Sequence, residues 1–158
     1  MITVLLVCTG NICRSPLAEA LLRREVAARD LDVEVSSAGT GAWDGAPASE
    51  GAYLVGLEHD LDLSAHRARM LTRDVIKRAD LILTMSRHHR ARIQELDPRA
   101  RVHLLGEYAG RSGDDAEVAD PFGADLETYR ETFAQLDELT RVVAGRLATE
   151  SDAESQGH

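Results

Sequence analysis

The sequence predicts an α/β fold, a four-stranded parallel sheet with helices on both faces. Short apolar runs, such as residues 2–7 and 80–85, have the length of buried strands, and segments with apolar residues at helical spacing alternate with them. The first run also leads through a tight loop directly into a helix that begins near Pro16. Such an alternation of strands and helices is typical of a parallel sheet covered on both sides.

The elements are expected in one continuous domain. Strands are expected at residues 2–7, 33–37, 80–85 and 102–105. Helices are expected at residues 16–29, 47–58, 72–78 and 86–95, and along the C-terminal segment from Leu126, where apolar residues mark one face. Glycine-containing loops are expected at residues 39–45 and 106–123. Residues 1–148 are expected to form the domain, and residues 149–158 an acidic flexible tail.

Composition and charge exclude several classes of protein. The net charge of −9 argues against nucleic-acid binding, because phosphate backbones are bound by clustered Lys and Arg. We expect no membrane span and no export, because the chain lacks a long apolar run and enters a strand at once. With only two cysteines, a reducing cytoplasm is the expected location. His88 and His89 are adjacent without a cysteine pair nearby, so we expect no metal and no cofactor.

The loop that follows the first strand carries the strongest chemical signal. Cys8 ends the strand, and five residues separate it from Arg14. Backbone N–H groups and a helix N-terminus converge on an anion in such a loop, and they favour a thiolate at Cys8. Arg14 can bind two phosphoryl oxygens at once. We expect Gly10 to allow a positive φ or a close approach, Ser15 to cap the helix and Pro16 to be its first residue.

A structural cysteine in an ordinary strand-to-helix turn is the alternative interpretation of this loop. The strand before Cys8 and the Ser15-Pro16 pair after Arg14 favour the anion-binding interpretation. A thiolate inside a ring of N–H donors is equipped to attack a phosphate ester. The loop therefore predicts an enzyme that transfers a phosphoryl group.

A second catalytic group is needed, because an alkoxide or phenolate leaves badly unless it is protonated. Asp120 is the candidate general acid. It lies in a loop with three other acids (Asp114, Asp115 and Glu117), whose repulsion would help it to hold a proton. We expect Pro121 to stiffen the backbone behind it and Phe122 to shield it from water. The alternative is a solvated acidic turn before a helix that begins at Asp125.

Four motifs together resemble the low-molecular-weight protein tyrosine phosphatases. They are the loop from Cys8 to Pro16, Ser-Ala-Gly-Thr at 37–40, Ser-Ala-His-Arg-Ala-Arg at 64–69, and Asp120-Pro121. They occur in the family's order over residues 1–148. The resemblance implies a Rossmann-like phosphatase I fold and the hydrolysis of phosphotyrosine in phosphorylated proteins. The reaction would pass through a phosphocysteine on Cys8, with Arg14 binding phosphate and Asp120 as the acid, without a metal.

The resemblance also implies roles for other residues of the loop and its surroundings. Thr9, Gly10 and Ile12 would line the phosphate site, and Ser15 would hydrogen-bond the Cys8 sulfur. Asn11, Ser37 and His66 match a network that holds the loop in shape. From the residues alone, His66 is instead a surface or partly buried histidine at a helix start. Cys13 matches a second cysteine that can form a reversible disulfide with the nucleophile, and its alternative is a small buried residue.

Signals for the substrate point in two directions. Ile12 offers an apolar wall for an aromatic ring, and Trp43 matches the family's aromatic rim residue, unless it packs on the next helix. The sequence from Asp120 to Gly123, with Tyr129-Arg130, resembles the protein arginine phosphatase branch. In that branch a threonine takes the place of Ile12, and the threonine hydroxyl can order a guanidinium. We therefore favour phosphotyrosine, with phosphoarginine as the alternative.

Two other classes of protein that use a similar cysteine loop fit the sequence less well. An arsenate reductase of this fold would need a distal cysteine pair, and the residues around Ser86 contain none. A phosphocysteine carrier of a sugar-transport relay would need neither Arg14 nor Asp120. The presence of both argues for a phosphatase.

Overall fold

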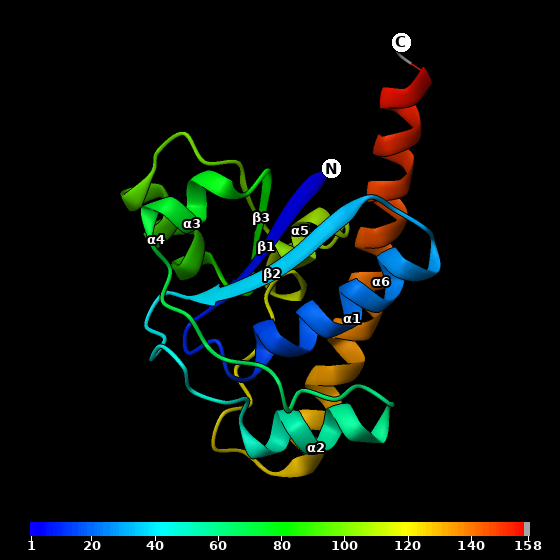
Figure 1. Ribbon diagram of the computed structural model, residues 1–158. Helices are drawn as coiled ribbons and strands as arrows, with labels where there is room; N and C mark the ends of the chain where they lie inside the picture. The colour runs from blue at the N-terminus through cyan, green and yellow to red at the C-terminus, as the bar shows by residue number, and fades with distance from the viewer. Residues whose placement is uncertain (157–158) are drawn as a thin grey trace.

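The computed structural model describes residues 1–156 and contains one four-stranded parallel sheet (Figure 1). Its strands are β1 (Ile2–Cys8), β2 (Val33–Gly39), β3 (Leu81–Thr84) and β4 (Val102–Leu104), in the order β2-β1-β3-β4. The predicted four-stranded parallel sheet is therefore confirmed. β1 is a central strand, so its side chains are buried on both faces of the sheet.

Helices cover both faces of the sheet, as predicted. They are α1 (Arg14–Ala28), α2 (Glu50–Glu58), α3 (Arg73–Arg78), α4 (Arg87–Leu96), α5 (Leu105–Tyr108) and α6 (Leu126–Gln156). On one face, Val4 and Leu6 pack with α1, α2 and α6. On the other face, Leu5 and Val7 pack with α3 and α4. The alternation along β1 thus divides its side chains between two hydrophobic cores.

Several element boundaries differ from the expected ones. The helical segments α5 and Gly113–Ala116 lie in what we expected to be a loop around residues 106–123. Helix α2 begins at Glu50 rather than at residue 47, because the Ser49 side chain accepts a hydrogen bond from the Ala52 N–H and caps the helix. Helix α6 continues to Gln156, whereas we expected a flexible tail from residue 149. The last two tail positions, 157–158, lie outside the described residues.

The outer edge of β2 is closed by two arginine side chains. The Arg23 guanidinium donates to the Val35 carbonyl over 3.1 and 2.8 Å. Arg69 Nε donates to the Ser37 carbonyl over 2.9 Å. Because β2 is the first strand of the sheet, these carbonyls have no neighbouring strand to accept from. The arginines satisfy backbone acceptors that would otherwise face solvent.

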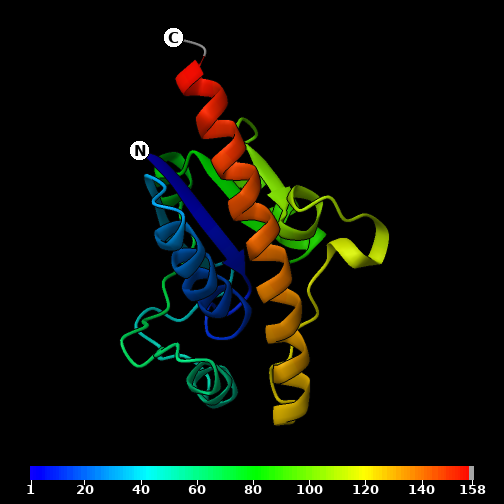
Figure 2. The same cartoon turned by 90° about the vertical axis from the view of Figure 1, so that its right-hand side faces the viewer.

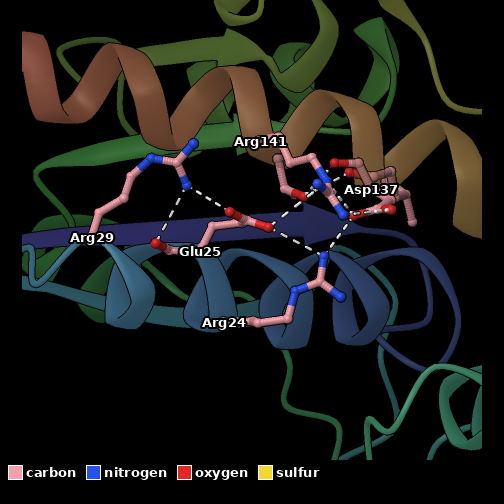
Figure 3. A network of polar contacts seen from close by, with 7 residues as sticks. Arg24, Glu25, Arg29, Asp137 and Arg141 are labelled. Atoms are coloured by element: carbon pink, nitrogen blue, oxygen red, sulfur yellow. Dashed lines mark hydrogen bonds and ion pairs between the residues drawn. The ribbon is translucent and has the colours of Figure 1, made fainter.

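Helices α1 and α6 run side by side on one face of the sheet, and ion pairs connect them (Figures 2 and 3). Arg24 of α1 donates to Asp137 Oδ1 over 2.6 Å, and Arg141 binds the same oxygen over 3.0 Å. Glu25 accepts from Arg29 over 2.6 Å. Although partial burial opposes ionisation, hydrogen bonds from Arg141 and Arg24 hold the pKa of Asp137 below its usual value. The bonds that Asp137 makes in this network therefore contribute their full stability only while its carboxyl group is charged.

Asp137→Asn is expected to lower the free energy of unfolding at pH 7 by about 0.5–1 kcal/mol, since the pairs are partly exposed. The folded-state pKa of Asp137 is lowered, so its contribution is complete above 3.8 and is lost as the pH falls through its folded-state value. The difference between variant and parent should shrink accordingly in urea titrations below pH 3.8. Glu131→Gln, an exposed position on the same helix, is the control. An equal loss in that variant would contradict a specific role for the network.

Candidate active site

The loop between β1 and α1 forms the floor of a pocket of about 180 Å³. Cys8 is buried at the end of β1, with its Sγ 2.9 Å from Ser15 Oγ, and the Asn11 N–H donates to the same sulfur over 3.3 Å. The residues that line the pocket are Cys8, Thr9, Gly10, Ile12, Cys13, Arg14, Asp120 and Phe122. The structure thus brings most of the predicted site residues into one cavity.

Asn11 is the centre of the network that shapes the loop. Its side chain is buried, and its Nδ2 donates to Ser15 Oγ over 2.7 Å and to Ser37 Oγ over 2.9 Å. Its Oδ1 accepts from the Arg69 N–H over 3.0 Å. Its carbonyl lies 2.7 Å from His66 Nε2, and since a carbonyl only accepts, Nε2 must carry the proton. Asn11, Ser37 and His66 therefore meet, and His66 is half-buried in a turn rather than at a helix start.

The glycine and serine expectations within the loop need correction. The positive φ falls on Asn11, at 57°, and not on Gly10. A Cβ on Gly10 would lie 3.5 Å from the nearest protein atom, so no contact within the protein requires a glycine there, and a close approach of the bound anion stays a prediction. The helix N-cap is Cys13, which places Ser15 and Pro16 inside the first turn. Ser15 does not cap the helix because its hydroxyl is bound to Cys8 and Asn11 instead.

Gly39 at the end of β2 allows this strand to lie against the loop. The Gly41 N–H donates to the Thr9 carbonyl over 2.9 Å, and Thr40 donates to the Cys8 carbonyl over 3.0 Å. A Cβ on Gly39 would come within 2.3 Å of the Thr9 carbonyl oxygen. Only glycine fits here without moving the loop.

Arg14 is held below the pocket with one donor unused. Its side chain is 4% exposed, and one terminal nitrogen donates to the Val118 carbonyl over 2.9 Å and to Ser86 Oγ over 3.4 Å. The other lies 3.7 Å from Asp120 Oδ2. Within the part of the chain that the structure describes, Arg14 Nε is the one buried side-chain nitrogen or oxygen without a hydrogen-bond partner. A buried N–H donor is costly to leave unpaired, so this atom favours an anionic ligand in the pocket.

Asp120 lines the pocket from the opposite side. Its Oδ1 accepts from the Phe122 N–H over 3.0 Å, which fixes the side chain in a turn, and half of it is exposed. Of the competing acids, Glu117 is engaged with Arg87, and Asp114 and Asp115 are exposed and do not line the pocket. Placement therefore distinguishes Asp120 from its neighbours. An acid that lies beside an arginine and lines the same pocket as a thiol can exchange a proton with a leaving group or with water.

Cys13 belongs to a ring of three hydroxyl and thiol groups that the sequence did not indicate. Its thiol donates to Ser49 Oγ over 3.1 Å, and the Tyr129 hydroxyl lies 3.3 Å from the sulfur and 3.2 Å from Ser49 Oγ. Each group has one proton, so Ser49 must donate to Tyr129 and Tyr129 to Cys13. Burial raises the pKa of Cys13, and it raises that of Tyr129 to about 12. Both cysteines are free thiols, and the expected disulfide stays a prediction.

The two aromatic candidates for the substrate rim differ in position. Trp43 is 84% exposed and does not line the pocket, so its packing on the next helix is excluded. Phe122 is 65% exposed and lines the pocket together with Ile12. The ring wall of the pocket in this structure is therefore Ile12 and Phe122, and the rim role of Trp43 stays a prediction.

Comparison with known proteins agrees with this geometry. Residues 3–153 match the family described as low molecular weight phosphotyrosine protein phosphatase. The chain belongs to this family. The predicted family is thereby confirmed, and with it a cysteine-dependent phosphatase.

Relatives within the family carry two different activities in their names. The chain is 38% identical to the low molecular weight protein-tyrosine-phosphatase Wzb of Escherichia coli K12 over 149 residues, covering 93% of this chain and 96% of that one. It is 39% identical to a protein-arginine-phosphatase of Geobacillus stearothermophilus over 147 residues, covering 93% and 97%. A crystal structure of a YwlE mutant from Bacillus subtilis superposes with a TM-score of 0.87 at 36% identity, covering 94% of this chain and 99% of that one.

Gly39→Ala is expected to lower the free energy of unfolding by roughly 1–3 kcal/mol and to reduce phosphatase activity, because the new methyl group must displace the Thr9 carbonyl. Gly41→Ala is the matched control, since the nearest atom to its Cβ would be 3.8 Å away. Urea unfolding and p-nitrophenyl phosphate hydrolysis measure the two effects. Equal behaviour of the two variants would contradict the importance of this close approach.

Proposed function

We propose that this protein hydrolyses phosphotyrosine in phosphorylated proteins through a phosphocysteine intermediate. The observation that carries the proposal is the single pocket in which Cys8, Arg14 and Asp120 meet beneath an apolar wall. A thiol, a guanidinium and a carboxyl group in one cavity supply a nucleophile, a charge-stabilising group and an acid. No metal or other cofactor takes part in the proposed reaction.

In the first step, the Cys8 thiolate attacks phosphorus and the bond from phosphorus to the leaving oxygen breaks. Asp120 donates its proton to that oxygen, so tyrosine leaves as a neutral phenol. Arg14, with its unused Nε–H, and the loop N–H groups bind the phosphoryl oxygens. In the second step, water attacks the phosphocysteine while Asp120 takes up a proton. Ser15, 2.9 Å from Sγ, stabilises the thiolate as it leaves.

The lining of the pocket supports an aromatic substrate. The side chains of Ile12 and Phe122 flank it, and apolar walls gain free energy when a phenyl ring covers them. The arginine-phosphatase-like Tyr129 does not line the pocket, because its hydroxyl is bound to Cys13 and Ser49. One of the two signals for phosphoarginine is therefore a packing residue in this protein.

Protein arginine phosphatase activity is the second candidate. It is favoured by the 39% identity to a protein of that name and by Phe122, which does line the pocket. A phosphoarginine guanidinium needs polar partners, however, and Ile12 offers it none.

We also infer that the protein acts in the cytoplasm, which suits two free thiols. No helix in the described residues is both long and apolar enough to cross a membrane.

Cys8→Ser is expected to abolish turnover while the fold is retained, because no base adjoins the residue to activate a serine hydroxyl. Hydrolysis of p-nitrophenyl phosphate measures turnover, and circular dichroism checks the fold. A substantial rate in this variant would exclude Cys8 as the nucleophile.

Asp120→Asn is expected to slow the hydrolysis of phenyl phosphate by roughly 10²–10⁴, the usual contribution of a positioned acid. The loss should be smaller for p-nitrophenyl phosphate, whose leaving group needs less protonation. Asp115→Asn serves as the control, because Asp115 is exposed and outside the pocket. A larger loss in the Asp115 variant would show that Asp120 is not the general acid.

The parent is expected to prefer phosphotyrosine over phosphoarginine peptides by about tenfold or more in kcat/KM, as an unpaired guanidinium N–H costs roughly 1–3 kcal/mol. Ile12→Thr should lower this preference, because a hydroxyl supplies a polar contact and the apolar wall shrinks. Paired peptides of one sequence, carrying either phosphorylated residue, measure the ratio. A parent that is faster on phosphoarginine would establish the second candidate instead.

A further inference from the structure

His89 is a buried titratable side chain with no part in the reaction proposed above. It lies on α4, is 0% exposed, and was notable in the sequence only as the neighbour of His88. Both of its ring nitrogens have partners. The Ser86 N–H donates to Nδ1 over 3.1 Å, and Nε2 lies 2.8 Å from Thr9 Oγ1.

These two contacts fix the tautomer of His89. Nδ1 accepts a hydrogen bond from a backbone N–H, so it carries no proton itself, and the neutral ring must then hold its proton on Nε2. Nε2–H therefore donates to the Thr9 hydroxyl oxygen. Burial, together with the nearby charges of His88 and Arg14, lowers the pKa of His89 to about 3. The ring consequently stays neutral throughout the pH range in which a phosphatase of this kind would work.

One partner of His89 lies at the start of the phosphate-binding loop, and the other contacts the residue at its end. Thr9 directly follows Cys8, and its side chain lines the pocket. Ser86 accepts a hydrogen bond from Arg14, the last residue of the loop, over 3.4 Å. The Ser86 carbonyl in turn accepts from Thr84 at the end of β3 over 3.1 Å. One imidazole thus connects the residue beside the sulfur to the residue that supports the guanidinium.

We propose that His89 is a positioning residue for phosphoryl transfer, which acts through Thr9 and Ser86 on the two ends of the loop. The proposal rests on the proposed role of Cys8 as nucleophile. Asn11 and its partners hold the middle of the loop from the β2 side, and His89 holds its ends from the β3 side. Because an arginine or a thiolate that is misplaced by a fraction of an ångström loses transition-state contacts, the effect should fall mainly on kcat.

A double-mutant cycle tests whether His89 acts through Thr9. Thr9→Val removes the hydroxyl at nearly constant shape, and His89→Leu removes both ring nitrogens. Each single variant is expected to lower kcat for p-nitrophenyl phosphate by about tenfold, with a smaller change in KM. The double variant should lose clearly less than the product of the two single losses, because the same hydrogen bond is removed twice. Losses that multiply, or a His89→Leu variant as active as the parent, would overturn the proposal.

Further variants keep the test decisive if His89→Leu does not fold. His89→Gln can accept from Ser86 through its carbonyl oxygen and donate to Thr9 through its amide, so it should recover most of the lost kcat. Failure of a folded His89→Gln variant to exceed folded His89→Ala would count against the proposal. Arg92→Gln, at an exposed position of the same helix that does not line the pocket, is the control and should retain parental kinetics.

A spectroscopic measurement needs no variant. Nitrogen-15 NMR of the parent should show His89 as the neutral Nε2–H tautomer from pH 5 to 8, and an Nδ1–H tautomer or a charged ring would overturn the assignment. An active Cys8→Ser enzyme would refute the proposed chemistry without affecting the tautomer. Additive losses in the cycle would refute the role of His89 without affecting Cys8.

Discussion

The buried amide of Asn11 is the interaction on which the rest of the site depends. A non-glycine residue at a φ of 57° is uncommon, and it persists here because both ends of its side chain and its own carbonyl are bound. That conformation turns the Asn11 N–H toward the Cys8 sulfur and brings the same amide to Ser15. These hydrogen bonds therefore stabilise the curved backbone conformation in which the loop can surround an anion.

The parallel sheet places the partners of this amide where they are needed. The carboxyl ends of β1, β2 and β3 lie at one edge, and they deliver Cys8, Ser37 and the segment before Ser86 to the same small volume. Ligand sites of open α/β sheets lie at this edge for the same reason. The central position of β1 also buries the strand that ends in the nucleophile, so the thiol itself lies in the hydrophobic core.

Features of the site that depend on residues close together in the sequence could be predicted, and those that depend on distant segments could not. The sheet was predicted from the alternation of short apolar runs with segments of helical spacing, and the family from the loop around Cys8 and Arg14 and three further motifs, all of which are local patterns. Contacts between distant segments left no pattern in the chain: the hydrogen bonds that Ser49, Tyr129 and His89 make to the loop became visible only in the structure. Ser15 shows the same limit, because its sequence suited a helix cap until tertiary bonds to Asn11 and Cys8 claimed the hydroxyl.

Arg69 has two tasks that are usually separate. Its side chain covers the last part of the open β2 edge, and its backbone N–H binds the Asn11 amide. An exposed sheet edge invites a strand from another molecule, and a guanidinium on the carbonyls blocks that pairing. A strand from another molecule that paired with β2 at Ser37 would have to displace the Arg69 side chain. Such a displacement would disturb the segment that supports the loop around Cys8. Arg69 therefore joins the protection of the β2 edge to the support of the catalytic loop, the first through its side chain and the second through its backbone.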